Sequence, residues 1–459
     1  MFCKHCGYQI SGHANFCPEC GRKLSRGNGR DLKWLKILIA CVLVVGIGIG
    51  IGAAVRNIGG EKAVVGQVLQ EDSRPNASED TSILHIGGKN AEIRQVLPIA
   101  DGSVAVLYED GTVRASENAQ FSGKVSDWER IKRLYCKENV DYRDKEYHYE
   151  YILVGLTEAG TVRTTAGDLS GWNGVEKLYF PYEGIVGVTG EGKVLLHETE
   201  GDLSLLEGLT DVKELVCGIL WGDIWGCLKK DGTVYLLSDY TDPNQVYWTD
   251  VKELRDSGHA FYVIKNDGTV DGQMYDDYAG LKDAVKVVDY SDWLFGISAD
   301  GRLLTHNGGN IYTNTGAFMV DEPGVDYYAG EVDIAAYDQV KDIMVFDGLF
   351  LLNEDGTVDS ISVYPEWNLS GWKNIEKIYG DKDWNTGLSK LYGLRKDGSV
   401  ILATATGWEE AVQTEEDNYR GWKLKEIYVG DSGVVGLTTE ETLVGDGIYE
   451  MVDFSVFDR

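Results

Sequence analysis

Hydrophobic residues in this chain form one long uninterrupted run near the N-terminus and many short runs after it. Residues 37–55 read ILIACVLVVGIGIGIGAAV and contain no charged side chain. A helix of this length rises about 28 Å, close to the hydrocarbon thickness of a bilayer. We therefore predict one transmembrane helix over 37–55. A buried core helix is the alternative, but a Gly-rich run suits a membrane span better than a soluble helix.

The short hydrophobic runs lie in pairs on either side of a repeated turn. LKKDGTVYLL at 228–237 is one copy, and two apolar runs around Asp-Gly predict a β-hairpin. Asp231-Gly232 suits the centre of a two-residue type I′ turn, in which both residues have a positive φ. The same position recurs at Gly111, Gly160, Gly192, Gly232, Gly268, Gly301, Gly356 and Gly398, and LTTEETLVG at 437–445 is a degenerate ninth copy.

A second repeated phrase precedes many of these hairpins. It reads WNGVEKL from residue 172, WTDVKEL from 248 and WKNIEKI from 372. Trp, Val or Ile, and Leu or Ile follow one another at three-residue intervals, which by itself suggests a helical turn. Trp and β-branched residues before two further strands instead favour an edge strand that enters with a bend. Each unit then consists of a strand, a loop, a strand, an Asp-Gly turn and a third strand.

Units of this size predict a repeat architecture. The turn glycines are separated by 32 residues (Gly160 to Gly192) up to 55 residues (Gly301 to Gly356), and such a unit cannot bury its own faces. Stacking buries them, and radial closure protects most strand edges. We therefore predict an all-β fold, a single β-propeller over 84–459. An open solenoid is the alternative.

The repeats also resemble a known family. WTDVKELRDSGHAFYVIKNDGTV at 248–270 resembles the regulator-of-chromosome-condensation-type repeat, although Gly258 and His259 are adjacent here and the family's Gly-Gln-Leu-Gly loop is missing. The resemblance covers roughly 84–459. It implies a seven-bladed propeller that presents loops to a partner, as exchange factors and secreted inhibitors of this type do. Seven blades are therefore favoured, and the eight clear turns with a ninth copy keep eight or nine possible.

A cysteine cluster precedes the predicted span. Residues 3–20 read CKHCGYQISGHANFCPEC, so Cys3, Cys6, Cys17 and Cys20 form two C-x2-C pairs. Four thiolates at this spacing complete the tetrahedral shell of a structural Zn²⁺, which would supply the folding energy of so short a segment. Residues 1–24 resemble the short zinc ribbon of bacterial membrane proteins, which implies the same four ligands. A disulfide pair is the alternative. Cys217 and Cys227, across a predicted hairpin, are a further possible pair.

Charge is distributed unevenly around the span. Residues 1–36 contain seven Lys/Arg and two Asp/Glu, a net charge of +5. The whole chain has a net charge of −31, so the remaining residues have a net charge of −36. The basic segment 25–36 places the N-terminus in the cytoplasm by the positive-inside rule, and the body beyond the 56–83 linker outside the cell. An acidic body excludes nucleic-acid binding. A cleaved signal peptide is the alternative to an anchor.

Two overlapping GxxxG pairs lie within the predicted span. Gly46 with Gly50 and Gly48 with Gly52 would let two helices approach closely, which predicts a possible dimer through the membrane. A Gly-rich single span is the equally simple interpretation. The partners expected from the sequence are therefore the membrane, a protein or cell-envelope ligand and, where the GxxxG pairs are used, a second copy of the chain.

No catalytic motif is recognisable in the body of the chain. Its histidines, at 85, 148, 197, 259 and 306, lie in no catalytic frame. Tyr, Asp and Asn cluster in three segments, 137–151, 238–248 and 305–330, and rigid aromatic side chains beside acidic ones are typical of recognition surfaces. We therefore predict a membrane-anchored, non-catalytic binding protein. A propeller lyase or hydrolase acting on envelope glycans, and a receptor signalling through the zinc ribbon, are the alternatives.

Overall fold

The structure is a computed structural model that describes residues 92–457 with internal gaps. The residues omitted within this range are 144–145, 182–183, 198–202, 219–223, 239–240, 257–260, 274–277, 291–292, 310, 315–316, 320–329, 362–366, 384–385 and 407–413. The chain divides into two units, Met1–Gly60 and Glu61–Arg459, and every described residue belongs to the second. The predicted zinc ribbon, basic segment, transmembrane helix and linker therefore lie outside the described residues.

Among the described residues, no helix is long and apolar enough to cross a membrane. They are all-β, as the sequence predicts, apart from short 3-10 turns, and form ten small antiparallel sheets. The 3-10 turns are η2 (Ser204–Leu206), η3 (Ala279–Leu281), η4 (Ile334–Ala336), η5 (Tyr419–Gly421), η6 (Gly447–Tyr449) and η7 (Phe454–Phe457).

Nine of the sheets run in chain order, first strand to last, and share one plan. Their strands are β1 (Ile93–Pro98), β2 (Val104–Tyr108) and β3 (Val113–Ala115); β4 (Ile131–Arg143), β5 (Glu146–Thr157) and β6 (Val162–Thr164); β7 (Val175–Tyr179), β8 (Ile185–Thr189) and β9 (Val194–His197); β10 (Val212–Gly218), β11 (Ile224–Lys229), β12 (Val234–Leu237) and β13 (Val246–Trp248); β14 (Val251–Asp256), β15 (Phe261–Lys265) and β16 (Val270–Gly272); β17 (Ala284–Tyr290), β18 (Trp293–Ser298) and β19 (Leu303–Thr305); β23 (Val340–Phe346), β24 (Gly348–Asn353) and β25 (Val358–Ile361); β26 (Ile375–Asp383), β27 (Leu388–Arg395), β28 (Val400–Thr406) and β29 (Thr414–Glu416); β30 (Leu424–Val429), β31 (Val434–Thr438) and β32 (Leu443–Gly445).

The tenth sheet has a different strand order. It consists of β21 (Ala317–Met319), β20 (Ile311–Asn314) and β22 (Gly330–Val332), with β20 in the middle. It lies within the long interval between the turns at Gly301 and Gly356, so the third Tyr-, Asp- and Asn-rich segment forms an inserted sheet.

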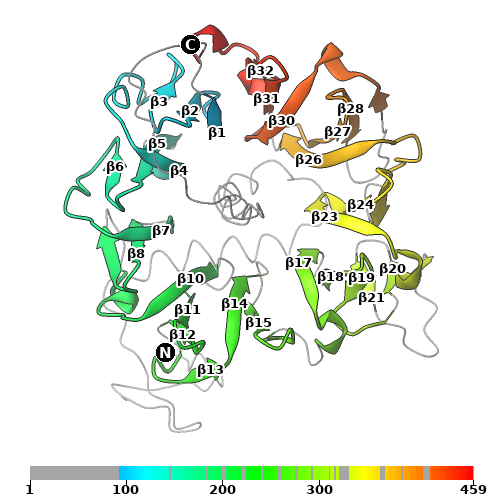
Figure 1. The fold of residues 1–459 in the computed structure, drawn as a ribbon, viewed down its shortest axis with the longest axis horizontal. Helices are drawn as coiled ribbons and strands as arrows, with labels where there is room; N and C mark the ends of the chain where they lie inside the picture. The colour runs from blue at the N-terminus through cyan, green and yellow to red at the C-terminus, as the bar shows by residue number, and fades with distance from the viewer. Residues whose placement is uncertain are drawn as a thin grey trace, which may run out of the picture. The chain divides into compact units, whose positions relative to one another are not determined.

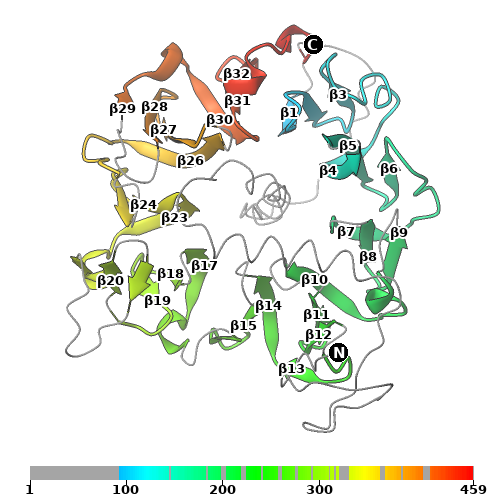
Figure 2. The same ribbon diagram turned by 180° about the vertical axis from the view of Figure 1, so that it is seen from behind.

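Hydrophobic clusters lie between consecutive sheets and not within single ones. Leu107 of β2 packs with Leu153 of β5, for example, and Val106 of β2 packs with Val435 of β31. The described residues contain nine such clusters, and each joins two of the nine sheets that share the plan. The sheets follow one another in chain order, and β30–β32 lies beside β1–β3 (Figures 1 and 2). None of the nine sheets that share the plan therefore buries its faces alone, as the repeat length predicts.

The repeated turn differs from the prediction in its type. Lys229 and Thr233 close a three-residue loop through the Lys229 N–H, which donates to the Thr233 carbonyl at 2.8 Å. Of Asp231 and Gly232, only the glycine has a positive φ, 83°. The Asp231 carboxylate instead accepts hydrogen bonds from the Thr233 N–H and hydroxyl. The prediction of a two-residue type I′ turn was wrong. Asp231 stabilises the turn through its side chain and does not adopt the left-handed backbone that a type I′ turn would require of it.

The positions of the repeated turns are confirmed. All eight predicted glycines have φ between 74° and 87°, and Glu441 takes the same conformation, with φ of 64°, in the degenerate ninth copy. The carbonyl of Gly232 also accepts a hydrogen bond from the N–H of Val251, the first residue of the next sheet. The same bond joins Gly111 to Ile131 and Gly160 to Val175. Each turn therefore attaches its own sheet to the following one.

A β-bulge explains the three-residue spacing of the second phrase. The pairing register shifts between Val175 and Lys177 at the start of β7, and at the equivalent place in the other sheets that share the plan. One extra residue in a strand returns the third residue to the same face. Val175 and Leu178 are consequently both buried although three residues separate them. The predicted bent edge strand is thus confirmed, and its bend is this bulge.

The tryptophans of the phrase pack against glycines of the middle strands. A Cβ atom on Gly187 of β8 would lie 2.6 Å from the Trp172 ring, and one on Gly393 of β27 would lie 2.6 Å from the Trp372 ring. Trp372 is completely buried. The glycines leave room for the indole, which explains why the two residue types recur together.

Cys217 and Cys227 are both thiols in the structure. Across β10 and β11, Cys217 pairs with Trp225 and Cys227 with Leu215. The possible disulfide is therefore not formed, because the register places neither cysteine opposite the other.

A candidate recognition surface

The two ends of each sheet differ in regularity. One end carries the repeated turn, and the opposite end carries the connection between the first and second strands. In the second sheet this connection belongs to a much longer hairpin, because β4 and β5 remain paired from Ile131 and Thr157 out to Arg143 and Glu146. In the next sheet, β7 and β8 pair only as far as Tyr179 and Val186. The eight additional residues of β4 lengthen it by about 26 Å. We call residues 138–151 the tall hairpin.

The tall hairpin exposes two tyrosines on one face. Tyr147 and Tyr149 are 40% and 43% exposed, whereas Tyr151 at the base is 9% exposed. Alternate residues of a strand share a face, and residues paired across two strands share it too. Val140 opposite Tyr149 and Glu138 opposite Tyr151 therefore lie on the tyrosine face.

A single glutamine fixes the base of the tall hairpin. The Gln120 side chain accepts a hydrogen bond from the Tyr151 N–H at 3.2 Å and donates one to the Tyr149 carbonyl at 3.4 Å. Tyr151 also packs with Leu97 and Ile99 of the first sheet. The tyrosine face is therefore directed toward β1–β3, which positions it beside the acidic residues of the neighbouring loops.

Carboxylates from four sheets meet at this end of the molecule. We call them the acidic rim: Asp101 between β1 and β2, Glu138 in β4, Asp381 and Asp383 in β26, and Asp431 between β30 and β31. Burial, followed by the negative charge of Asp431, raises the pKa of Glu138. Burial, followed by the charge of Asp383, raises the pKa of Asp431. No cationic side chain contributes to lowering either of these two pKa values.

Asp381 is the most deeply buried member of the rim. It is 2% exposed, and neither of its carboxylate oxygens has a hydrogen bond in the described structure. Burial raises the pKa of Asp381 to about 7, against the opposing charge of Lys390 and with a further contribution from Asp446. The Gly433 amide is close enough to lower this pKa slightly, but it does not meet hydrogen-bonding geometry.

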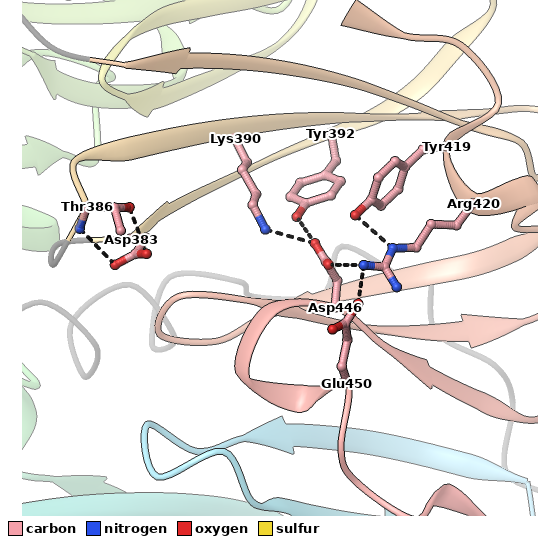
Figure 3. A network of polar contacts seen from close by, with 8 residues as sticks. All are labelled: Asp383, Thr386, Lys390, Tyr392, Tyr419, Arg420, Asp446 and Glu450. Carbon is pink, nitrogen blue, oxygen red and sulfur yellow. Dashed lines mark hydrogen bonds and ion pairs between the residues drawn. The ribbon is translucent and has the colours of Figure 1, made fainter. Parts of the chain in front are cut away.

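Lys390 does not neutralise Asp381, because it binds elsewhere. The two residues pair directly across β26 and β27, so their side chains share a face. The Lys390 ammonium nevertheless donates to Asp446 of the neighbouring sheet at 2.9 Å (Figure 3). The Asp381 carboxylate therefore points toward β30–β32, where Asp431 lies, and has no donor of its own there.

Asp446 shows the opposite environment a short distance away. Its side chain is 4% exposed and accepts hydrogen bonds from Lys390 at 2.9 Å, the Tyr392 hydroxyl at 2.9 Å and Arg420 at 2.8 Å. Burial opposes ionisation, but Lys390 and the Tyr392 hydroxyl outweigh it and lower the pKa of Asp446. Arg420 also pairs with Glu450 (Figure 3). This network joins β26–β29 to β30–β32.

The charged residues of the second phrase also join sheets. Glu214 in β10 lies 3.5 Å from the Lys177 ammonium of the preceding sheet and 3.6 Å from Arg255 of the following one. Lys286 in β17 lies 2.6 Å from Asp342 in β23. We call these pairs the charge belt. Its carboxylates have cationic partners, whereas Glu138 and Asp431 in the rim have none among the side chains that the structure describes.

The residues proposed from sequence fall into two groups. Cys3, Cys6, Cys17 and Cys20 lie outside the described residues, as do His85 and His259. Within the described ranges, no group of His, Cys, Asp and Glu side chains is arranged to hold a metal ion. His306 packs on Trp293, with ring centroids 4.6 Å apart.

The three segments proposed as recognition loops have different structures. The segment 137–151 contains the tall hairpin, 238–248 supplies the edge strand β13, and 305–330 contains most of the inserted sheet, which ends at Val332. The sequence thus pointed to the segment that contains Glu138, Tyr147 and Tyr149, and it assigned no individual ligand-binding residue. It gave no signal for Asp101, Asp381 or Asp431, which come from separate repeats and meet only in the folded chain.

Comparison with known proteins identifies the N-terminal segment. Residues 2–24 match the zinc-ribbon domain family. The chain has no match among curated proteins.

Several solved structures are similar to the chain at low scores. They include the computationally designed Ika8 protein (13% identity, TM-score 0.34, covering 78% of this chain and 97% of that chain) and the CRINKLY WD40 ectodomain of the Arabidopsis thaliana receptor kinase ACR4 (12%, 0.28, 59% and 96%). A third is the complex of Kap60 with yeast RCC1 (Prp20) (11%, 0.29, 82% and 85%). TM-scores this low assign neither a fold nor a partner to this chain.

Proposed function

We propose that this chain is a membrane-anchored, non-catalytic binding protein whose extracytoplasmic body recognises a protein or cell-envelope ligand. The observation that carries the proposal is the tall hairpin, which exposes Tyr147 and Tyr149 beyond the ends of the neighbouring hairpins. Exposed tyrosines on a rigid strand supply contact area at little conformational cost. The uncharged run at 37–55 and the basic segment before it support the anchor and its orientation.

The body is proposed to be a closed β-propeller of nine blades. Support comes from the nine clusters that join consecutive sheets, including the one between β30–β32 and β1–β3. Hydrogen bonds also link the C-terminal segment to the first sheet: the Tyr449 hydroxyl donates to the Ile99 carbonyl at 2.9 Å, and the Tyr108 hydroxyl donates to the Phe457 carbonyl at 2.8 Å. The sheet of β20–β22 is then an insertion and not a blade.

The N-terminal segment is proposed to bind a structural zinc ion on the cytoplasmic side. Support comes from the match of residues 2–24 to the zinc-ribbon family and from the two C-x2-C pairs, Cys3 with Cys6 and Cys17 with Cys20. Four thiolates are a donor set that closes the Zn²⁺ coordination shell. Such a site stabilises a fold and leaves no position for a substrate.

The binding role can be tested with the full-length chain in detergent. Immobilised wild type and a Tyr147→Ser/Tyr149→Ser variant are exposed to envelope extract from the same cells, and the retained components are compared. We expect a component that the wild type retains and the variant loses. A Val285→Ser/Met451→Ser variant, which removes exposed apolar side chains elsewhere, should retain it. Equal retention by the wild type and the hairpin variant would contradict the proposal.

A further inference from the structure

We propose that the ligand of this surface is a protein segment rich in Lys or Arg, which docks on the acidic rim against the tyrosine face of the tall hairpin. This inference rests on the proposed function and specifies the chemistry of the partner. It follows from the charges that the fold leaves unpaired, from one buried carboxylate without a donor, and from the aromatic groups beside them.

Glu138 and Asp431 differ from the carboxylates that join adjacent sheets, because no cationic side chain in the described part of the chain pairs with them. Glu214, Asp342 and Asp446 each have Lys or Arg partners from a neighbouring sheet. Glu138 and Asp431 are influenced only by burial and by another carboxylate. Like charges brought together without a counter-charge disfavour the ionised state, so the fold holds these groups at an energetic cost that a cationic partner would remove.

Asp381 supplies an independent observation. Burying a carboxylate whose two oxygens have no hydrogen bonds costs folding free energy, and such groups are rare in native structures. The nearest ammonium, that of Lys390, is already bound by Asp446. The Asp381 carboxylate lies near enough to Asp446 and Asp431 of the neighbouring sheet for their charges to raise its pKa. An ammonium or guanidinium group bound at Asp431 would favour ionisation of the buried Asp381 through space, because the charge of Asp431 now opposes it.

The tyrosine face favours a protein segment over a small cation. Tyr149 offers an exposed ring next to Glu138, and Tyr147 continues the same face toward the hairpin tip. Cations bind favourably over such rings. The rim extends over four sheets, from Asp101 and Glu138 to Asp383 and Asp431. A single small cation cannot contact all of these residues, whereas a chain with several Lys or Arg side chains can.

The test measures binding of defined peptides to the full-length chain in detergent. Fluorescent hexa-arginine and hexa-glutamate peptides are titrated at low salt, and anisotropy reports the Kd. We expect binding of hexa-arginine alone. In a Glu138→Gln/Asp431→Asn variant its affinity should fall about tenfold or more, because two partly buried charge pairs are lost. Both replacements introduce uncharged side chains at positions where the fold disfavours a charge, so the variant should fold. A thermal melt checks that it does.

The matched control removes the same charge from the other end of the sheets. Glu191 and Glu354 are exposed residues of the repeated turns, and a Glu191→Gln/Glu354→Gln variant should bind hexa-arginine as the wild type does. If both variants bound hexa-arginine equally weakly, the loss of affinity would follow from net charge alone, and the inference would be overturned. Unchanged affinity in the rim variant would also overturn it, as would displacement of the peptide by spermidine at an equal concentration of charge.

These outcomes can be separated from failure of the proposed function. If the wild type retains an envelope component through Tyr147 and Tyr149 but the rim variant retains it equally well, the binding role stands and the cationic partner is excluded. If no retained component depends on those tyrosines, the proposed function fails, whatever the peptides show.

Discussion

The charge belt and the acidic rim use the same residue types in opposite ways. In the belt, Glu214 lies between Lys177 and Arg255, and each pair crosses from one sheet to the next. In the rim, Glu138 and Asp431 face other carboxylates. The belt residues belong to the repeated phrase, and each forms an ion pair with a residue of an adjacent sheet. The rim positions lie where the repeats diverge, and two of them, Glu138 and Asp431, have no cationic partner among the described residues. Divergent, unpaired positions are therefore where we expect binding.

The largest predicted effect comes from removing a carboxylate that the fold does satisfy. Asp446→Ala should lower the free energy of unfolding by about 3–5 kcal/mol, because Lys390 and Arg420 lose their shared buried partner. Chemical denaturation followed by tryptophan fluorescence measures it. Asp453, an exposed carboxylate that binds only Ser455 of its own turn, is the control, and Asp453→Ala should change little. If the two variants lowered the free energy of unfolding equally, the Asp446 network would not contribute specifically to stability.

The next effect tests the regular end of the sheets. Gly160→Ala should cost about 3 kcal/mol, because φ is 74° and a Cβ would lie 2.8 Å from the Val175 nitrogen of the next sheet. Gly123 has a similar φ of 82° with nothing within 4 Å of a Cβ, so Gly123→Ala should cost only about 1 kcal/mol. The difference in denaturation midpoints isolates the contact between sheets. If the two variants unfold alike, that contact is unimportant.

Asp381 gives a change of opposite sign. With its pKa near 7 in the folded chain and near 4 when unfolded, the folded state keeps a proton that the unfolded state has lost. Stability therefore falls as the pH rises from about 4 to 7 and is constant above that range. Asp381→Asn should remove this dependence and stabilise the protein at pH 8 by about 2 kcal/mol. Denaturation at pH 5 and pH 8 measures it, and a destabilised variant at pH 8 would contradict the assignment.

The smallest effect is expected in the belt. Lys286 and Asp342 are about half exposed, so Lys286→Ala should cost no more than about 0.5 kcal/mol and less at high salt. Comparing melting temperatures at low and high ionic strength checks this. A loss above 2 kcal/mol would mean that the belt, and not the hydrophobic clusters, holds adjacent sheets together.

The repeated sequence predicted the sheets well because each repeat is local. The positions of the turn glycines, the three-strand unit and the bent entry strand all follow from residues close together in the chain. The type of turn was predicted wrongly because a two-residue loop and a three-residue loop share the same Asp-Gly pair. The deciding contact, from Asp231 to Thr233, depends on side-chain geometry.

The sequence by itself determined the all-β repeats and the spacing of the four cysteines, and it alone carries the prediction of the anchor, since each is a pattern of neighbouring residues. The tertiary structure alone decided that Asp101, Glu138, Asp381 and Asp431 share one end, and that Lys390 binds Asp446 and leaves Asp381 without a donor. These residues come from sheets far apart in the chain, and charge interactions act through space. Only the packing of the sheets against one another brings them together.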